Sequence, residues 1–136
     1  MFNILKFYKM SIKFKVIERG QPGVAGGGEK KYYANAVSSG EMTLAKLTTA
    51  IEKRSTVSGA DIRAVLYAMV DVMKESLADG QIVRLGDLGS LRVSINSNGE
   101  ATEKEVSAKS INGARTIFTP GKELKNALMT LDYEKI

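Results

Sequence analysis

The chain has 136 residues, of which 43% are hydrophobic, so it is long enough for one domain with an extension. It contains no histidine and no cysteine, which removes the commonest general base, the thiol nucleophile and the usual zinc ligands. No pair of carboxylates stands out from a solvated surface, and we therefore predict no enzyme, no catalytic residue, no metal site and no cofactor. The lack of cysteine is typical of a reducing cytoplasm.

The net charge of +5 is unevenly distributed along the chain. Residues 1–40 carry seven basic and two acidic side chains, whereas residues 41–136 carry thirteen of each. An excess of positive charge favours polyanionic partners such as nucleic acid. The neutral balance of the second segment argues against a strong, indiscriminate affinity for DNA.

The chain begins with a short apolar stretch, residues 1–9, which is interrupted by lysines. It lacks a long apolar run and a small-residue cleavage site, so we do not interpret it as a signal peptide. It is also too short to span a bilayer. Met10 is an alternative start, because a regular pattern begins directly after it.

Two strands are predicted in the N-terminal segment. Apolar and charged residues alternate over residues 12–18, and residues 31–37 form a second strand that is able to pair with the first. The glycine-rich residues 22–28 between them lack the spacing of a P-loop or a dinucleotide fingerprint, which favours a flexible linker over a phosphate cradle. The lysines of this segment form either a basic stripe or a solubilising strand face: Lys13, Lys15, Lys30 and Lys31.

Two helices follow. Thr43 is a natural N-cap for a helix whose apolar face carries Leu44, Leu47 and Ile51. After a break over residues 55–59, Ser58 begins a second helix, which Asp79-Gly80 ends. Its wide apolar stripe contains Ile62, Val65, Leu66, Met69, Val70, Met73 and Leu77. A small chain covers such a stripe poorly, which indicates that a second copy packs against it.

The rest of the chain predicts a small sheet and a last helix. Residues 82–85 and 90–95 form a hairpin around the glycines of residues 86–89, and Asn98-Gly99 is a signal for a tight turn. The return strand lies within residues 106–118, with a bulge or kink at Gly113 and Phe118 in the core. Thr119 and Pro120 are expected to open the last helix. Its apolar face carries Leu124, Ala127, Leu128 and Leu131.

These elements resemble the HU / integration-host-factor family of bacterial DNA-binding proteins over roughly residues 41–131. Residues 77–93 (Leu-Ala-Asp-Gly-Gln-Ile-Val-Arg-Leu-Gly-Asp-Leu-Gly-Ser-Leu-Arg-Val) are similar to the family's L-x-x-G-x-x-V-x-L-x-G-F-G-x-F motif. Residues 118–125 (Phe-Thr-Pro-Gly-Lys-Glu-Leu-Lys) are similar to its F-x-P-G-K-x-L-K motif. The strand-rich extension resembles the variant branch called HU-HIG. The resemblance implies an α+β, HU-like fold in an intertwined homodimer, with a basic β-strand extension at residues 1–40 and a DNA-binding domain at residues 41–136.

The arm departs from the family pattern. Ordinary members carry a proline at the arm tip that wedges between bases and kinks the duplex. The two prolines of this chain, Pro22 and Pro120, lie elsewhere, and the arm holds three acids that phosphate would repel: Glu100, Glu103 and Glu105. These features argue against intercalative bending, and a short arm that serves dimer contacts is an alternative.

Candidate DNA contacts lie on the strands of the predicted saddle and at the start of the last helix. They are Arg84, Ser90, Arg92, Lys109, Arg115, Gly121 and Lys122. Lys109 and Arg115 are placed on the return strand, and the amides of Gly121 and Lys122 at the helix start are candidates for a phosphate. For the charged residues, solvation or pairing with an acid is the alternative. For Gly86 and Gly89 we expect a role in shaping the turn.

The leading hypothesis is histone-like binding of duplex DNA with little sequence preference, in the nucleoid of the cytoplasm. The expected partners are double-stranded DNA and a second copy of the chain, with no membrane and no small-molecule substrate. The rival hypothesis is a dimeric scaffold or protein-interaction module that keeps the fold and has weakened or lost the grip on DNA. The neutral second segment and the acidic arm favour the rival.

Overall fold

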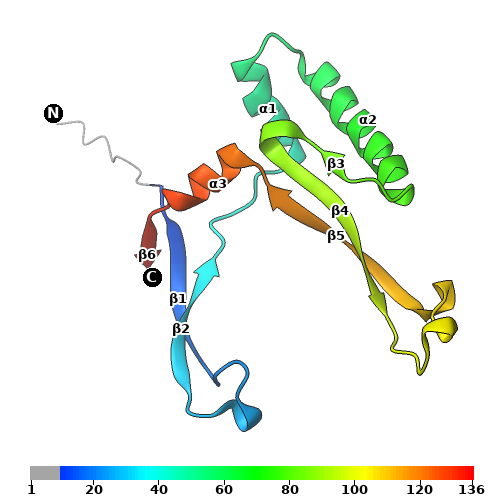
Figure 1. Cartoon of the computed structure of the whole chain (residues 1–136). Coiled ribbons are helices and arrows are strands. Elements are labelled where there is room, and N and C mark those ends of the chain that lie inside the picture. The colour runs from blue at the N-terminus through cyan, green and yellow to red at the C-terminus, as the bar shows by residue number, and fades with distance from the viewer. Residues whose placement is uncertain (1–9) are drawn as a thin grey trace. The chain divides into compact units, whose positions relative to one another are not determined.

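The computed structural model describes residues 10–136, so the predictions for residues 1–9 lie outside the described part of the chain. The chain has an α+β fold (Figure 1). Its elements fall into two units: a terminal unit of residues 10–43 together with 129–136, and a central unit of residues 44–128.

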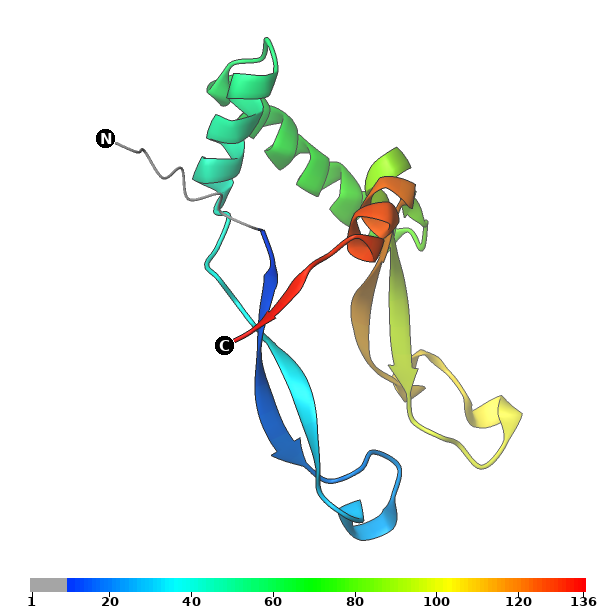
Figure 2. The same cartoon turned by 90° about the vertical axis from the view of Figure 1, so that its left-hand side faces the viewer.

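The terminal unit is a three-stranded sheet of order β2-β1-β6. Strands β1 (Ile12–Arg19) and β2 (Lys31–Val37) pair antiparallel across the glycine-rich loop, which confirms the two strands and the pairing expected between them. Figure 2 shows this long hairpin with its loop at one end. The loop contains a short 3-10 turn (Ala25–Gly27), and its glycines Gly23, Gly26, Gly27 and Gly28 all have positive φ.

Strand β6 (Tyr133–Lys135) corrects the prediction for the end of the chain. Helix α3 ends at Met129, so Leu131 does not lie on it, and the chain continues parallel to β1. Two backbone bonds flank this pairing: Ile12 N–H donates to Asp132 C=O at 2.8 Å, and Ile136 N–H donates to Phe14 C=O at 3.0 Å. These bonds are made at the free edge of β1. Because β1 is distant in sequence from residues 124–131, the helical pattern of those residues did not predict β6.

The central unit begins with helices α1 (Leu44–Arg54) and α2 (Gly59–Ala78). The Ser58 hydroxyl accepts a hydrogen bond from the Asp61 backbone N–H at 3.2 Å, which confirms Ser58 as the N-cap of α2. Gly80, with a φ of 76°, follows the last turn and directs the chain toward the sheet.

The central sheet has the order β3-β4-β5 and is antiparallel. Its strands are β3 (Val83–Arg84), β4 (Gly89–Ser97) and β5 (Ile111–Pro120), and a 3-10 turn (Gly86–Leu88) joins the first two. Pro120 ends β5 opposite Gly89, and helix α3 (Lys122–Met129) begins only at Lys122. The prediction that Thr119 caps the helix is therefore wrong, because both residues still belong to the sheet.

Asn98-Gly99 does not make a tight turn. Residues 98–110 connect β4 to β5 instead, and they contain two 3-10 turns, Glu103–Glu105 and Ala108–Ser110. Buried Ser110 organises this arm: its hydroxyl donates to Glu100 Oε1 at 2.8 Å, and its carbonyl accepts from Asn98 N–H at 2.7 Å. The register shifts at Asn96/Ser97, beside the predicted irregularity at Gly113.

A single chain buries very little apolar surface. Among residues 10–136, Ile62 is the one hydrophobic residue that is buried. Phe118, which the sequence placed in the core, is 47% exposed, and Val65 and Val70 on α2 are 63% and 51% exposed. These three side chains are not covered by residues 10–136 of the same chain, so part of the α2 stripe and one side of the sheet remain open, whereas Ile62 of the stripe is buried.

Candidate nucleic-acid interface

One face of the central sheet gathers four of the predicted contact residues. Side chains alternate between the two faces of a strand, and directly opposed residues share a face. Ser90 lies opposite Arg84 on one side and Thr119 on the other. Arg92 lies two residues beyond Ser90 and Arg115 lies opposite Ser94, so both arginines share the face of Ser90.

We name this surface the arginine face. It consists of Arg84, Ser90, Arg92, Ser94, Asn96, Arg115, Ile117 and Thr119. The three arginines are exposed, and none makes an ion pair with another described residue. Strands β3, β4 and β5 contain no acidic residue at all, so the field above this face is not cancelled by carboxylates of the sheet.

The opposite face of the central sheet is apolar. It carries Val83, Leu91, Val93, Ile95, Ala114 and Phe118, together with Thr116, which lies opposite Val93. Ile95 is 56% exposed and Val93 is 38% exposed in the single chain. The sheet is therefore amphipathic, with its cations on one side and an incompletely covered hydrophobic surface on the other.

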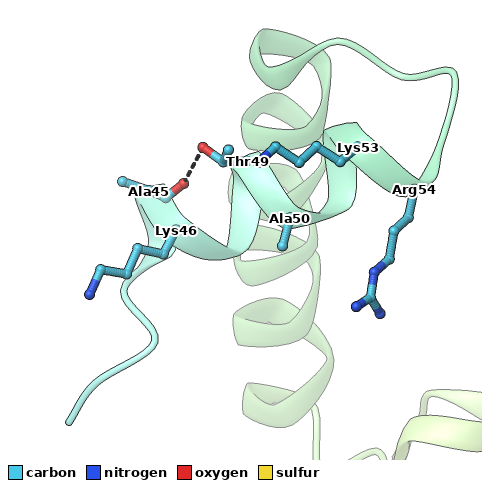
Figure 3. A pocket seen from close by; sticks show the side chains of 6 residues that line it. All are labelled: Ala45, Lys46, Thr49, Ala50, Lys53 and Arg54. Atoms are coloured by element: carbon cyan, nitrogen blue, oxygen red, sulfur yellow. Dashed lines mark hydrogen bonds between the residues drawn. The ribbon is translucent and has the colours of Figure 1, made fainter. Parts of the chain in front are cut away.

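A pocket of about 450 Å³ lies elsewhere, on α1, and sequence reasoning missed it. Figure 3 shows its cationic side chains, Lys46, Lys53 and Arg54, along the helix. Ala45, Thr49 and Ala50 line it between them, and the Thr49 hydroxyl donates to the Ala45 carbonyl at 3.1 Å (Figure 3). Lys53 and Arg54 lie seven and eight residues after Lys46, about two helical turns, and this spacing was the available signal.

At the turn end of the arginine face lies a second pocket of about 290 Å³. Its lining includes three predicted contacts, and its residues are Arg84, Gly86, Gly89, Ser90, Thr119, Pro120 and Gly121. A Cβ at Gly89 would collide with the Thr119 carbonyl oxygen, and one at Gly121 would collide with the Asp87 carbonyl oxygen. These glycines thus allow the β3–β4 turn and the β5–α3 connection to pack against each other.

The structure assigns the Gly121 amide a different role from the predicted one. Its N–H donates to the Leu88 carbonyl at 3.0 Å, and its carbonyl accepts from Lys125 N–H at 2.9 Å. The amide is therefore engaged within the fold and is not available to a phosphate in this conformation. Lys122 follows as the first residue of α3, and its side chain is exposed.

Lys109 lies apart from the arginine face. The sequence placed it on the return strand, but it belongs to the 3-10 turn Ala108–Ser110 in the arm, before β5 begins. Its backbone N–H donates to the Ser107 hydroxyl at 3.3 Å, which fixes the turn. Glu103 and Glu105 of the same arm are exposed, so the arm carries mixed charge.

Residues 10–136 contain neither a membrane-spanning helix nor a metal-binding cluster of acidic side chains. No helix in this range has the length and apolar character needed to cross a membrane. No cluster of three or more acidic side chains is arranged to hold a metal ion among these residues.

Comparison with known proteins gives one family and a structural likeness. The family described as "HU domain fused to wHTH, Ig, or Glycine-rich motif", HU-HIG, matches residues 10–135. The fold is similar to a crystal structure from Bacteroides vulgatus ATCC 8482, described as a candidate bacterial DNA-binding protein, with a TM-score of 0.61 and 16% identity. That match covers 94% of this chain and 49% of the other, so this chain spans about half the length of that protein. No curated protein matches the chain.

Proposed function

The chain belongs to the HU-HIG family, and on that premise we propose that its central unit binds duplex DNA through the arginine face. The observation that carries the proposal is the convergence of Arg84, Arg92 and Arg115 on one exposed face of a sheet that has no acidic residue. Cations that lie together on one face, and that pair with no acid among the described residues, are available to neutralise the phosphates of a polyanion. The candidate DNA-binding protein from Bacteroides vulgatus, which shares this fold, supports the same assignment.

The mechanism is phosphate binding without base readout. An arginine guanidinium donates two parallel hydrogen bonds to a phosphate and keeps its charge at every physiological pH. Contacts to phosphate and sugar fix the position of the protein on the duplex but carry no sequence information. We therefore propose binding with little sequence preference, which suits a role in organising the nucleoid in the cytoplasm. Ser90 and Lys122 add neutral and cationic donors at the turn end of the face.

We further propose that the binding species is a homodimer with two-fold symmetry. The apolar face of the central sheet and part of the α2 stripe lie open in the single chain, where Val65 is 63% exposed and Val93 is 38% exposed. A second copy that covers both surfaces would remove them from water and create a core that the single chain lacks. The mass of the protein in solution, measured by light scattering, tests this, and a value near 14.7 kDa would contradict it.

Anisotropy titrations with a labelled duplex at several salt concentrations test DNA binding. Contact with about four to six phosphates predicts that log affinity falls with log salt at a slope of about 0.9 per phosphate. We expect the double variant Arg92→Ala/Arg115→Ala to lower that slope by about 1.8 for each protomer that contacts the duplex, or about 3.6 for the dimer. The matched control is Arg63→Ala/Lys74→Ala, which removes the same charge from α2. Equal losses in the two variants would show that net charge, rather than the arginine face, drives binding.

The second candidate function is a dimeric scaffold that binds another protein. Its supporting observation is the arm, where Glu100, Glu103 and Glu105 would be repelled by phosphate and the wedging proline is missing. A chain that is dimeric in solution but shows no DNA binding at low salt would favour this function over the first.

A further inference from the structure

The hairpin of the terminal unit also separates its residues by face. The register places Lys15 opposite Asn35 and Arg19 opposite Lys31, so these four side chains lie on the same side of the sheet. We name this side the lysine face. Its members are Lys13, Lys15, Ile17, Arg19, Lys31, Tyr33, Asn35, Val37 and, on β6, Glu134.

The charges of the sheet are concentrated on this face. Four of its members are cations, and the one acid, Glu134, lies at the edge beside Lys13 and accepts a hydrogen bond from the Ser11 hydroxyl at 3.1 Å. The other face carries one base, Lys135, and one acid, Glu18, among apolar residues.

The cations of the lysine face are open to a ligand. Lys15, Arg19 and Lys31 are exposed, and within residues 10–136 none of them forms an ion pair. The Arg19 guanidinium carbon lies 4.7 Å from the centre of the Tyr33 ring, which holds the guanidinium in place by a cation–π contact. A positioned cation loses less conformational entropy when it binds a phosphate.

We propose that the lysine face is a second phosphate-binding surface for duplex DNA, distinct from the arginine face. This inference rests on the proposed function of the central unit and adds a region of the chain that takes part in it. Adjacent cations on one strand, such as Lys13 and Lys15, are about 6.8 Å apart along β1. Cations that are spaced along one strand in this way are able to contact different phosphates of the same duplex.

The same face fits a duplex better than single-stranded nucleic acid or a membrane. Stacking of an unpaired base needs an open aromatic ring, and Arg19 occupies one side of Tyr33. Insertion into a bilayer needs exposed apolar side chains next to the cations. In this sheet the exposed apolar residues Ile12 and Val16 lie on the opposite face, whereas Ile17 of the lysine face is half-buried.

The test is the salt dependence of DNA binding by the full chain with the substitutions Lys15→Ala/Lys31→Ala. For each protomer that contacts the duplex, the slope of log affinity against log salt should fall by about 1.8, which corresponds to an affinity loss of roughly sixtyfold at 0.1 M salt. The control Lys30→Ala/Lys135→Ala removes the same charge from positions outside the lysine face. Lys30 lies outside the strands, and Lys135 lies on the opposite face of the sheet. The control should retain a slope within about half a unit of the unmodified chain. Thermal melting of each variant checks that the sheet remains folded.

The possible outcomes separate this inference from the proposed function. If Arg92→Ala/Arg115→Ala weakens binding and Lys15→Ala/Lys31→Ala matches its control, the lysine-face proposal is overturned and the proposed function stands. If only the lysine-face variant weakens binding, the inference is supported and the arginine face is not the site. A lysine-face variant that loses affinity for phosphatidylserine vesicles but keeps that for DNA also overturns the inference.

Discussion

The central and terminal sheets both collect cations on one face and apolar side chains on the other, but they differ in residue type and in where the balancing acids lie. The arginine face has three arginines and no carboxylate on its strands, whereas the lysine face has three lysines, one arginine and Glu134 at its edge. Residues 41–136 carry equal numbers of acids and bases, yet every acid of this segment lies outside β3, β4 and β5. The summed charge of a segment therefore does not predict the field above one of its faces.

The largest expected effect is a loss of stability from a substitution that disrupts the central sheet but not the terminal sheet. Gly121→Ala would place a Cβ against the Asp87 carbonyl and force the turn and the β5–α3 connection apart. We expect a loss of roughly 3 kcal/mol in the free energy of unfolding, at the upper end for overpacking. Urea denaturation measures it. Gly99→Ala is the control, because nothing lies within 4 Å of a Cβ at that position, and an equal loss there would contradict the packing role.

The next effect concerns dimer dissociation, and it compares the apolar face of the central sheet with that of the terminal sheet. In the proposed dimer, Val93→Glu would bury an unpaired charge on the central sheet, which raises the dimer dissociation constant by about a hundredfold or more. Val16→Glu makes the same change on the terminal sheet, where Val16 is 44% exposed, and should leave the dimer intact. Sedimentation equilibrium distinguishes the two. A dimer broken by Val16→Glu alone would move the interface to the terminal unit.

A smaller effect tests whether residue type matters on the arginine face. Arg92→Lys/Arg115→Lys keeps the charge but removes the paired donors of the guanidinium, so the salt slope should hold while affinity falls by roughly three- to tenfold. The reciprocal change on the lysine face, Lys15→Arg/Lys31→Arg, should leave affinity equal or slightly higher. Anisotropy titration measures both. Unchanged affinity in the first variant would show that charge alone is used there.

The smallest effect concerns Tyr33. Tyr33→Leu keeps an apolar side chain in place but removes the ring beneath Arg19. Loss of the cation–π contact should lower stability by about 0.5 to 1 kcal/mol. Thermal unfolding of the full chain records the change. Arg19→Lys serves as the comparison, since a lysine can still lie over the ring, and we expect it to retain part of the stability.

Local patterns in the sequence predicted most of the secondary structure. Alternation predicted β1, and Ser58 predicted the start of α2, because each depends on residues that are neighbours in the chain. Arg92 and Ser90 share a face by their spacing alone. The placement of Arg84 and Arg115 beside them needed the pairing register, which local spacing does not contain.

The wrong predictions share a cause, since each depended on contacts between distant residues. Leu131 fits a helical spacing, but the edge of β1 draws the chain into β6. Pro120 is a residue type typical of the first helical turn, but it lies opposite Gly89 in the β4–β5 ladder and therefore belongs to the sheet. Asn98-Gly99 suits a tight turn, but the polar contacts of Ser110 stabilise a longer arm.

The parallel pairing of β6 with β1 has a consequence for biosynthesis. Strand β1 ends at Arg19 and strand β6 begins at Tyr133, so the first hairpin leaves the ribosome long before its third strand has been translated. Its open edge is exposed to the cytosol for several seconds at a rate of about 5–20 residues per second. During that interval the nascent hairpin is a substrate for chaperones or for pairing with a neighbouring polypeptide.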